Sequence, residues 1–255
     1  MTSQISNTEL IYDENLFIDK MSTNKGLKLL LKSQIQATRS IQRSITEIEI
    51  VINKILENIN KYKNSRLIYV GAGTSGRIGV QDGSELFPTF GWPKKRVLFI
   101  IAGKNKALTT SVEGAEDDII SAVSQFKEKN VNKSDILIAL AASGDTPFTV
   151  QIVKEARKIG SLTIGISNNL RGKLLSESEF NIFLDSGKEV LAGSTRLAAG
   201  TTQKICLNLI STMVMAKLGR VKQGRMNYLV ANNKKLRDRK TLINNLLKDQ
   251  SIKMK

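Results

Sequence analysis

The sequence predicts an α/β fold: a three-layer αβα sandwich on a mainly parallel five-stranded sheet, with helical additions at both ends. Short runs that are apolar throughout alternate with helical segments, a pattern typical of parallel strands covered on both faces. The 255 residues, 41% of them hydrophobic, are enough for one domain with a sizeable core and some additions. Several apolar runs end in glycine and hydroxyl residues, as ligand sites at the carboxyl edge of such sheets do.

The N-terminal part, residues 1–56, is predicted to be a helical extension. Residues 1–20 are polar and irregular. Isoleucines then recur at spacings of four and three, which predicts one apolar helical stripe made of Ile41, Ile45, Ile48, Ile52, Ile55 and Ile59. The stripe is suited to packing either on the same chain or on a second subunit.

Residues 57–220 are expected to form the sandwich. Apolar runs predict strands at 67–70, 97–101, 136–141, 162–167 and 182–184. One helix is expected to begin at Ser75 or Gly76, and a second, after residues 111–118, is expected to end at Lys129. Two more are expected at 147–159 and at about 197–218. Pro147 suits the first turn of its helix, where a missing N–H leaves no bond unmade. Residues 221–255 are expected to form a basic helical tail.

Composition excludes several kinds of chemistry. The chain has no histidine, which rules out Ser-His-Asp and Cys-His catalysis and histidine-ligated zinc. Cys206 is the single cysteine, so no internal disulfide forms, and its apolar helical surroundings favour a buried thiol over a nucleophile. Acid–base chemistry must come from Glu, Asp, Lys or Tyr. The sequence shows neither a signal peptide nor a bilayer-spanning run, so a cytoplasmic protein is expected.

The net charge of +16 raises the question of nucleic acid. Residues 217–255 hold 12 Lys and Arg against 2 Asp and Glu, a net of +10, so most of the excess lies in the C-terminal segment. A basic tail can bind nucleic acid or lipids. This tail lacks interleaved aromatics and any RNA-binding signature, so nucleic-acid binding ranks last among the hypotheses.

A glycine-rich stretch follows the first predicted strand, with Thr74 and Ser75 between Gly71, Gly73 and Gly76. Glycines let the backbone come close to a ligand, and the hydroxyls can donate hydrogen bonds to an oxyanion. The spacing matches G-x-G-x-x-G, but no acidic residue ends the next strand, and the Gly-Lys-Ser/Thr ending of a P-loop is missing. The stretch is therefore neither a dinucleotide fingerprint nor a P-loop, and it favours a small phosphoester such as a sugar phosphate.

Four segments are predicted to meet at the carboxyl edge of the sheet: 73–76, 142–144, 167–168 and 193–195. Each alone is a weak signal, because Ser and Gly are ordinary loop residues. Their convergence on one edge favours a phosphate pocket.

Five blocks, all in order, resemble the N-acetylmuramic acid 6-phosphate etherases, which carry the sugar isomerase (SIS) phosphosugar-binding domain. The blocks are GAGTSGRIGVQDGSELFPTFG, SVEGAEDD, AASGDTP, GISNN and GSTRLAAGTTQKICLNLIST. The resemblance spans about residues 8–236 and implies a lyase that splits the lactyl ether of its substrate. The products would be N-acetylglucosamine 6-phosphate and D-lactate, in recycling of cell-wall sugar. It also implies a homodimer that binds a phosphorylated amino sugar and needs no cofactor or metal.

The same resemblance suggests roles for individual residues. Glu85 would be the proton donor and Glu116 the second acid–base residue. From the residues alone, Glu85 could equally be a helix-surface carboxylate, and Glu116 a first-turn acid favoured by the helix dipole. The resemblance implies substrate contacts from Gly73, Thr74, Ser75, Ser143, Gly144, Ser194, Thr195 and Arg196, with Arg77 competing as the cation.

The chain departs from the family pattern at several positions. Asp145 stands where the family has a base, and it would repel phosphate or lactate if it faced the pocket. Gly224 and Tyr228 replace polar family residues, and a further helical region that the family carries is expected to be truncated here. The alternative hypothesis is therefore a phosphosugar-binding or regulatory protein without turnover, as the related glucokinase regulatory proteins are.

Overall fold

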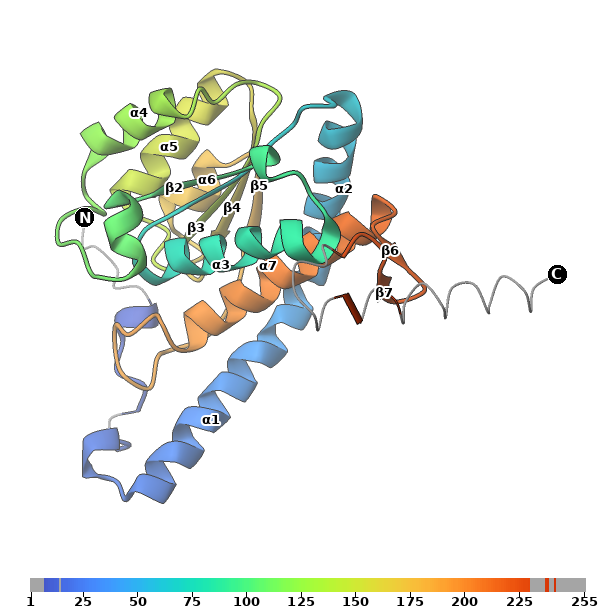
Figure 1. Ribbon diagram of the computed structural model, residues 1–255. Coiled ribbons are helices and arrows are strands. Elements are labelled where there is room, and N and C mark those ends of the chain that lie inside the picture. Colours follow the sequence, from blue (N-terminus) through green and yellow to red (C-terminus); the bar gives the residue numbers. More distant parts are fainter. Residues whose placement is uncertain (1–6, 14, 230–236, 239–240, 242–255) are drawn as a thin grey trace.

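A computed structural model describes residues 7–13, 15–229, 237–238 and 241, and it confirms the expected α/β architecture (Figure 1). Its five-stranded sheet is parallel throughout, with the order β2-β1-β3-β4-β5. The strands are β1 (Leu67–Gly71), β2 (Val97–Ile101), β3 (Ile136–Ala141), β4 (Leu162–Ser167) and β5 (Phe180–Phe183). The predicted bounds hold for β2, β3 and β4, whereas β5 begins two residues earlier than expected.

Helices cover both faces of the sheet. One face carries α2 (Ile45–Lys61), α3 (Gly73–Phe90) and α7 (Ala198–Lys217), and the other carries α4 (Ile119–Glu128), α5 (Pro147–Lys158) and α6 (Lys173–Glu177). Within β1, Leu67 and Tyr69 join the first core, while Ile68 and Val70 join the second. This alternation is what a strand covered on both faces requires, and it explains why β1 is apolar throughout.

The N-terminal isoleucine stripe is not one helix, which corrects the prediction. Helix α1 (Thr23–Ser40) is followed by a 3-10 turn, η3 (Ile41–Ser44), and only then by α2. The Ser44 hydroxyl donates a hydrogen bond of 2.6 Å to the Phe183 carbonyl at the end of β5, which fixes the break to the sheet. Ile45 is consequently 48% exposed, while the other five isoleucines of the stripe are buried. The sequence left open whether the stripe packs on the same chain or on a second subunit. Helix α2 packs on the same chain, against β5 and α7.

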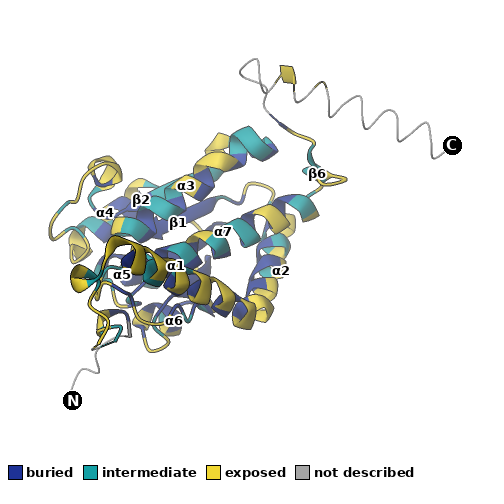
Figure 2. Ribbon diagram, turned by 90° about the horizontal axis from the view of Figure 1, so that it is seen from below, coloured by how far each residue is buried: buried dark blue, intermediate teal, exposed yellow. Residues whose placement is uncertain are grey.

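Helix α1 extends beyond the sheet and lies along α7 (Figures 1 and 2). Its inward residues are small or polar: Gly26, Ser33, Ala37 and Ser40. Much of α1 is exposed in Figure 2. Among its exposed residues are Leu27, Leu31 and Ile35, which are 61%, 61% and 43% exposed. The spacing of four places these three side chains on one face.

The segment after α7 begins as a hairpin and not as the expected helix. Strands β6 (Val221–Lys222) and β7 (Arg225–Met226) pair antiparallel across Gln223 and Gly224. Both turn residues have positive φ, +51° and +71°, as a two-residue type I′ turn needs, which accounts for glycine at 224. Most of the predicted basic tail lies outside the described residues.

Arg220 ties the hairpin to the domain. Its guanidinium lies 5.2 Å from the Trp92 ring and 5.1 Å from the Tyr228 ring, and it donates a hydrogen bond of 2.8 Å to the Phe90 carbonyl. Tyr228 therefore serves packing at the end of α3. None of the helices in the described part of the chain has the length and apolarity needed to cross a membrane.

Candidate active site

The glycine stretch forms a tight strand-to-helix turn. Helix α3 begins at Gly73, two or three residues earlier than predicted, and Gly73 has a φ of +52° that few side chains tolerate. A Cβ atom at Gly71 would lie 2.9 Å from the Gly76 nitrogen, and one at Gly76 would lie 2.9 Å from the Gly71 carbonyl oxygen. Gly71 and Gly76 therefore let β1 and α3 pack backbone to backbone.

The first turn of α3 is uncapped. Ala72 precedes it and offers no side-chain hydrogen bond to the N–H groups of the first turn. Those N–H groups and the positive end of the helix dipole are thus available to an anion. Ser75 is buried, so in this turn Thr74 is the residue whose hydroxyl borders the open space.

A cavity of about 410 Å³ lies at this helix start, and we call it the anion pocket. It is lined by Ala72, Gly73, Thr74, Arg77, Ala102, Ala107, Ser111, Val112, Glu113, Gly114, Ala115 and Glu116. The pocket joins the glycine turn to the segment SVEGAE, which sequence spacing alone could not place beside it.

The walls of the anion pocket are held by named contacts. Arg77 donates hydrogen bonds from Nε to the Ala107 carbonyl at 2.8 Å and from an Nη atom to the Thr110 carbonyl at 3.1 Å. The Phe148 N–H donates to the Glu116 carbonyl at 2.9 Å, tying this wall to the start of α5. The Glu116 side chain itself is exposed to the cavity. Arg77 therefore shapes the wall as well as bordering the cavity.

Glu85 lines a second cavity, of about 240 Å³, between α3 and α7, and we call it the acid pocket. Its walls are Ile78, Gln81, Asp82, Glu85, Lys204 and Asn208. The two helices run side by side in the same direction, because Gly200 packs near Thr74 while Ser211 bonds Asp82 further along (Figure 1).

Asp82 anchors the floor of the acid pocket. Its buried carboxylate accepts hydrogen bonds from the Tyr69 hydroxyl at 2.8 Å, the Asn208 amide at 2.8 Å and the Ser211 hydroxyl at 3.0 Å. Burial, and then the nearby Asp82 charge, raise the pKa of Tyr69 well above its ordinary value, so Tyr69 remains a donor. The network joins β1, α3 and α7 one turn before Glu85.

Glu85 and Glu116 do not share a pocket within one chain. Eleven residues of helix separate Thr74 in the anion pocket from Glu85, a rise of roughly 16 Å at 1.5 Å per residue. A hexosamine phosphate is too short to bridge that distance between the helix start and Glu85. The structure thus brings Gly73, Thr74 and Glu116 together and leaves Glu85 apart from them.

The end of β3 is held by internal contacts. The Ser143 hydroxyl accepts a hydrogen bond from the Asp145 N–H at 3.2 Å, and a Cβ atom at Gly144 would lie 2.7 Å from the Gly172 Cα. Asp145 turns toward α6, where its carboxylate accepts a hydrogen bond from the Lys173 N–H at 3.0 Å. Asp145 lines neither the anion pocket nor the acid pocket, so the repulsion expected of a pocket-facing acid does not arise.

The start of α7 is already occupied by a side chain of the protein. Glu189 is fully buried, and its two carboxylate oxygens accept hydrogen bonds of 2.9 Å from the N–H groups of Ala198 and Ala199. Burial raises the pKa of Glu189, while these bonds and the Arg196 charge act in the opposite direction. The loop with Ser194, Thr195 and Arg196 therefore does not lead into a free helix N-terminus.

That loop nevertheless lies next to the start of α3. A Cβ atom at Gly200 would be 3.2 Å from the Thr195 carbonyl oxygen and 3.3 Å from the Thr74 methyl group, so both residues border the same glycine. Ser194, Thr195 and Arg196 line neither of the two pockets. Sequence analysis assigned no role to Glu189, Lys204 or Asn208; for the last two, polar residues spaced by four on an apolar helix were the available signal.

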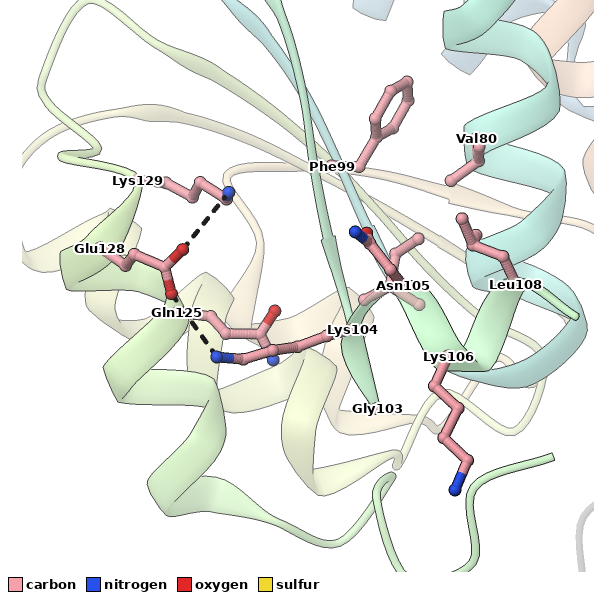
Figure 3. A pocket seen from close by; sticks show the side chains of 11 residues that line it. Val80, Phe99, Gly103, Lys104, Asn105, Lys106, Leu108, Gln125, Glu128 and Lys129 are labelled. Carbon is pink, nitrogen blue, oxygen red and sulfur yellow. Dashed lines mark ion pairs between the residues drawn. The ribbon is translucent and has the colours of Figure 1, made fainter. Parts of the chain in front are cut away.

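A further cavity of about 420 Å³ lies on the other side of η5 (Lys104–Leu108), against the edge strand β2 (Figure 3). Lys104 and Lys129 each approach the Glu128 carboxylate at 3.6 Å, so two of the lysines there already have a partner. None of the site residues predicted from the sequence lines this cavity.

Comparison with known proteins finds one family model and relatives that cover most of the chain. A family model, the glucokinase regulatory protein N-terminal SIS domain, matches residues 47–156. The N-acetylmuramic acid 6-phosphate etherase of Clostridium acetobutylicum is 44% identical over 232 residues, which are 91% of this chain and 76% of that protein. The etherase of Deinococcus radiodurans is 39% identical, over 91% of this chain and 75% of that protein.

Solved structures show the same fold. A putative phosphosugar isomerase of Bacteroides fragilis superposes with a TM-score of 0.59 and 19% identity, covering 80% of this chain and 95% of that one. The Vibrio vulnificus NanR protein, complexed with ManNAc-6P, gives a TM-score of 0.56 and 12% identity over 89% of this chain and 70% of that one.

Proposed function

The chain belongs to the N-acetylmuramic acid 6-phosphate etherase family, and from that premise we propose how its own residues perform the reaction. It is a carbon–oxygen lyase acting on N-acetylmuramic acid 6-phosphate. The products in this proposal are N-acetylglucosamine 6-phosphate and D-lactate, formed by elimination followed by hydration. The observation that carries it is the placement of Glu116 beside an uncapped, glycine-lined helix start.

The anion pocket holds the phosphate in this proposal. The N–H groups at the start of α3 and the Thr74 hydroxyl donate to its oxygens, and the helix dipole favours its charge. Ser75 contributes through its backbone N–H, since its side chain is buried. Arg77 borders the pocket and adds positive charge.

Residues from the neighbouring loops complete the sugar site. Thr195 lies beside Thr74 across Gly200, which supports substrate contacts from Ser194, Thr195 and Arg196. Ser143 and Gly144 follow β3 at the same carboxyl edge, and the Ser143 hydroxyl keeps its own hydrogen to donate.

Glu116 and Glu85 divide the proton transfers. The open-chain sugar has an aldehyde that acidifies the C2 proton, and Glu116 removes that proton. Glu85 protonates the ether oxygen at C3 as its bond to carbon breaks, releasing D-lactate. Water then adds at C3 of the unsaturated aldehyde and restores the hydroxyl. For these two transfers one carboxyl must start ionised and the other protonated.

A homodimer accounts for the distance between the two glutamates. The exposed face of α1 formed by Leu27, Leu31 and Ile35 offers an apolar surface to a second copy. In the dimer that we propose, the acid pocket of one copy lies against the anion pocket of the other, so that each site takes Glu85 and Glu116 from different chains. In this proposal the protein acts in the cytoplasm on a phosphorylated amino sugar. It does not bind nucleic acid as part of its function.

Release of D-lactate tests the function. The pure protein is incubated with N-acetylmuramic acid 6-phosphate beside the Glu85→Gln and Glu116→Gln variants. We expect lactate from the wild type and a loss of at least about 100-fold in each variant, as for a removed acid or base. No lactate above the Glu85→Gln control, with calorimetric binding of N-acetylglucosamine 6-phosphate intact, would instead support binding without turnover.

A further inference from the structure

The acid pocket holds a carboxyl group and an amino group that are not paired with each other. Glu85 on α3 and Lys204 on α7 both line it, and both side chains are exposed to it. Within the described ranges of the chain, neither group has an ion-pair partner within 4 Å. The Lys204 ammonium is therefore free to receive an anion from outside.

The other acid of this pocket does not need Lys204. Asp82 is satisfied by three neutral donors, and the Asn208 amide N–H is one of them. Because Asn208 is committed to Asp82, the wall side chains that remain to donate to a ligand are Gln81 and Lys204, and of these Lys204 is the charged one. Neutral donors hold Asp82 in place, while the Lys204 side chain is exposed.

We propose that Lys204 binds the carboxylate of the lactyl group and so selects ethers that carry an acid. The inference rests on the proposed function. In the substrate, a single carbon joins the ether oxygen to the carboxylate, so the group that protonates the oxygen and the group that binds the carboxylate must be neighbours. Glu85 and Lys204 are neighbours in the acid pocket, whichever copy of the chain supplies that pocket.

Electrostatics require such a cation. The lactyl carboxylate enters a pocket whose floor already holds the Asp82 carboxylate, and like charges at close range repel. An ammonium group offsets this repulsion and holds the leaving group as the bond at C3 breaks. A charge-assisted hydrogen bond of this kind corresponds to about 10- to 100-fold in binding or rate.

A pair of substrates tests the assignment. The first is N-acetylmuramic acid 6-phosphate, and the second is its lactyl methyl ester, which keeps the ether and loses the charge. N-acetylglucosamine 6-phosphate formation is measured for the wild type, Lys204→Met and Lys204→Arg, with Lys217→Met on the same helix as the control. We expect Lys204→Met to lower kcat/KM about 10- to 100-fold on the acid and hardly on the ester, with Lys204→Arg recovering part of the loss.

Equal losses on acid and ester would overturn the assignment, because they would place Lys204 in a general structural or phosphate-binding role. A wild type that forms no product from either substrate would contradict the proposed function instead. In that case calorimetry with the Glu85→Gln protein decides about Lys204. A weaker affinity in Glu85→Gln/Lys204→Met for N-acetylmuramic acid 6-phosphate, but not for N-acetylglucosamine 6-phosphate, supports the assignment, and unchanged affinities for both overturn it.

Discussion

Replacing Asp82 by alanine is expected to destabilise the protein and to disturb Glu85. The substitution removes the acceptor of three hydrogen bonds, from Tyr69, Asn208 and Ser211. Asn208 is only partly buried and can turn to water, but residues Tyr69 and Ser211 are 2% and 7% exposed, so their hydroxyls cannot. At about 1–3 kcal/mol for each buried donor left unpaired, the cost is about 2–6 kcal/mol.

Urea unfolding followed by circular dichroism measures this cost. Asp82→Asn is the matched control, because it keeps the volume and an acceptor oxygen for Ser211 and Asn208, while its amide can donate to the Tyr69 oxygen. We expect Asp82→Asn to lower the free energy of unfolding by about 1 kcal/mol, well below the alanine variant. Since Glu85 lies one turn further on α3, kcat should fall with Asp82→Ala more than with Asp82→Asn. A cost below about 1 kcal/mol for Asp82→Ala would refute the reasoning.

Three further outcomes follow from the core. Gly83→Ala would place its Cβ 2.7 Å from the Phe99 ring and 2.8 Å from the Tyr69 ring, so it should lower the free energy of unfolding by about 1–3 kcal/mol; an unchanged urea midpoint would contradict this. Burial raises the pKa of Glu189 above the ordinary 4.5, so its contribution to stability is complete below that pH and declines as pH rises through the raised pKa. Above pH 4.5 the free energy of unfolding should therefore depend less on pH in Glu189→Gln than in the wild type. Equal pH dependence in the two proteins would contradict this prediction. Burial also raises the pKa of Cys206, so a thiol reagent should label it only after unfolding, which rapid labelling of the native protein would disprove.

The sheet could be predicted because each strand is a short apolar run closed by turn residues. The predicted bounds of β2, β3 and β4 match those in the structure. That the strands are parallel follows from their alternation with helices. The start of α3 was placed too late because Gly73, with its positive φ, looks like a loop residue, whereas the helix already begins there, two or three residues earlier than predicted. The break at η3 was missed because the isoleucine period continues across it, and a tertiary bond from Ser44 to the end of β5 fixes the break.

The site was only partly predictable for a different reason. Gly73 and Thr74 could be predicted from the glycine-rich stretch, and Glu116 from the family resemblance. The fold brings these three residues together at one pocket. The capping of α7 by Glu189 depends on a loop path that spacing does not encode. Lys204 is one more lysine in a basic chain until its position opposite Glu85 is known. Residue type and charge identified candidate site residues in the sequence. Which residues contact one another became known only from the structure.

Complementation between two inactive variants tests most directly whether one site is built from two chains. Glu85→Gln and Glu116→Gln are each inactive in the proposed mechanism, and subunits of the two are exchanged by mixing. Half of the randomly paired dimers are then mixed, and each mixed dimer holds one site with both glutamates intact, so D-lactate release should recover to roughly a quarter of the wild-type rate. A mixture that exchanges subunits but releases no more lactate than the separate variants would contradict the account.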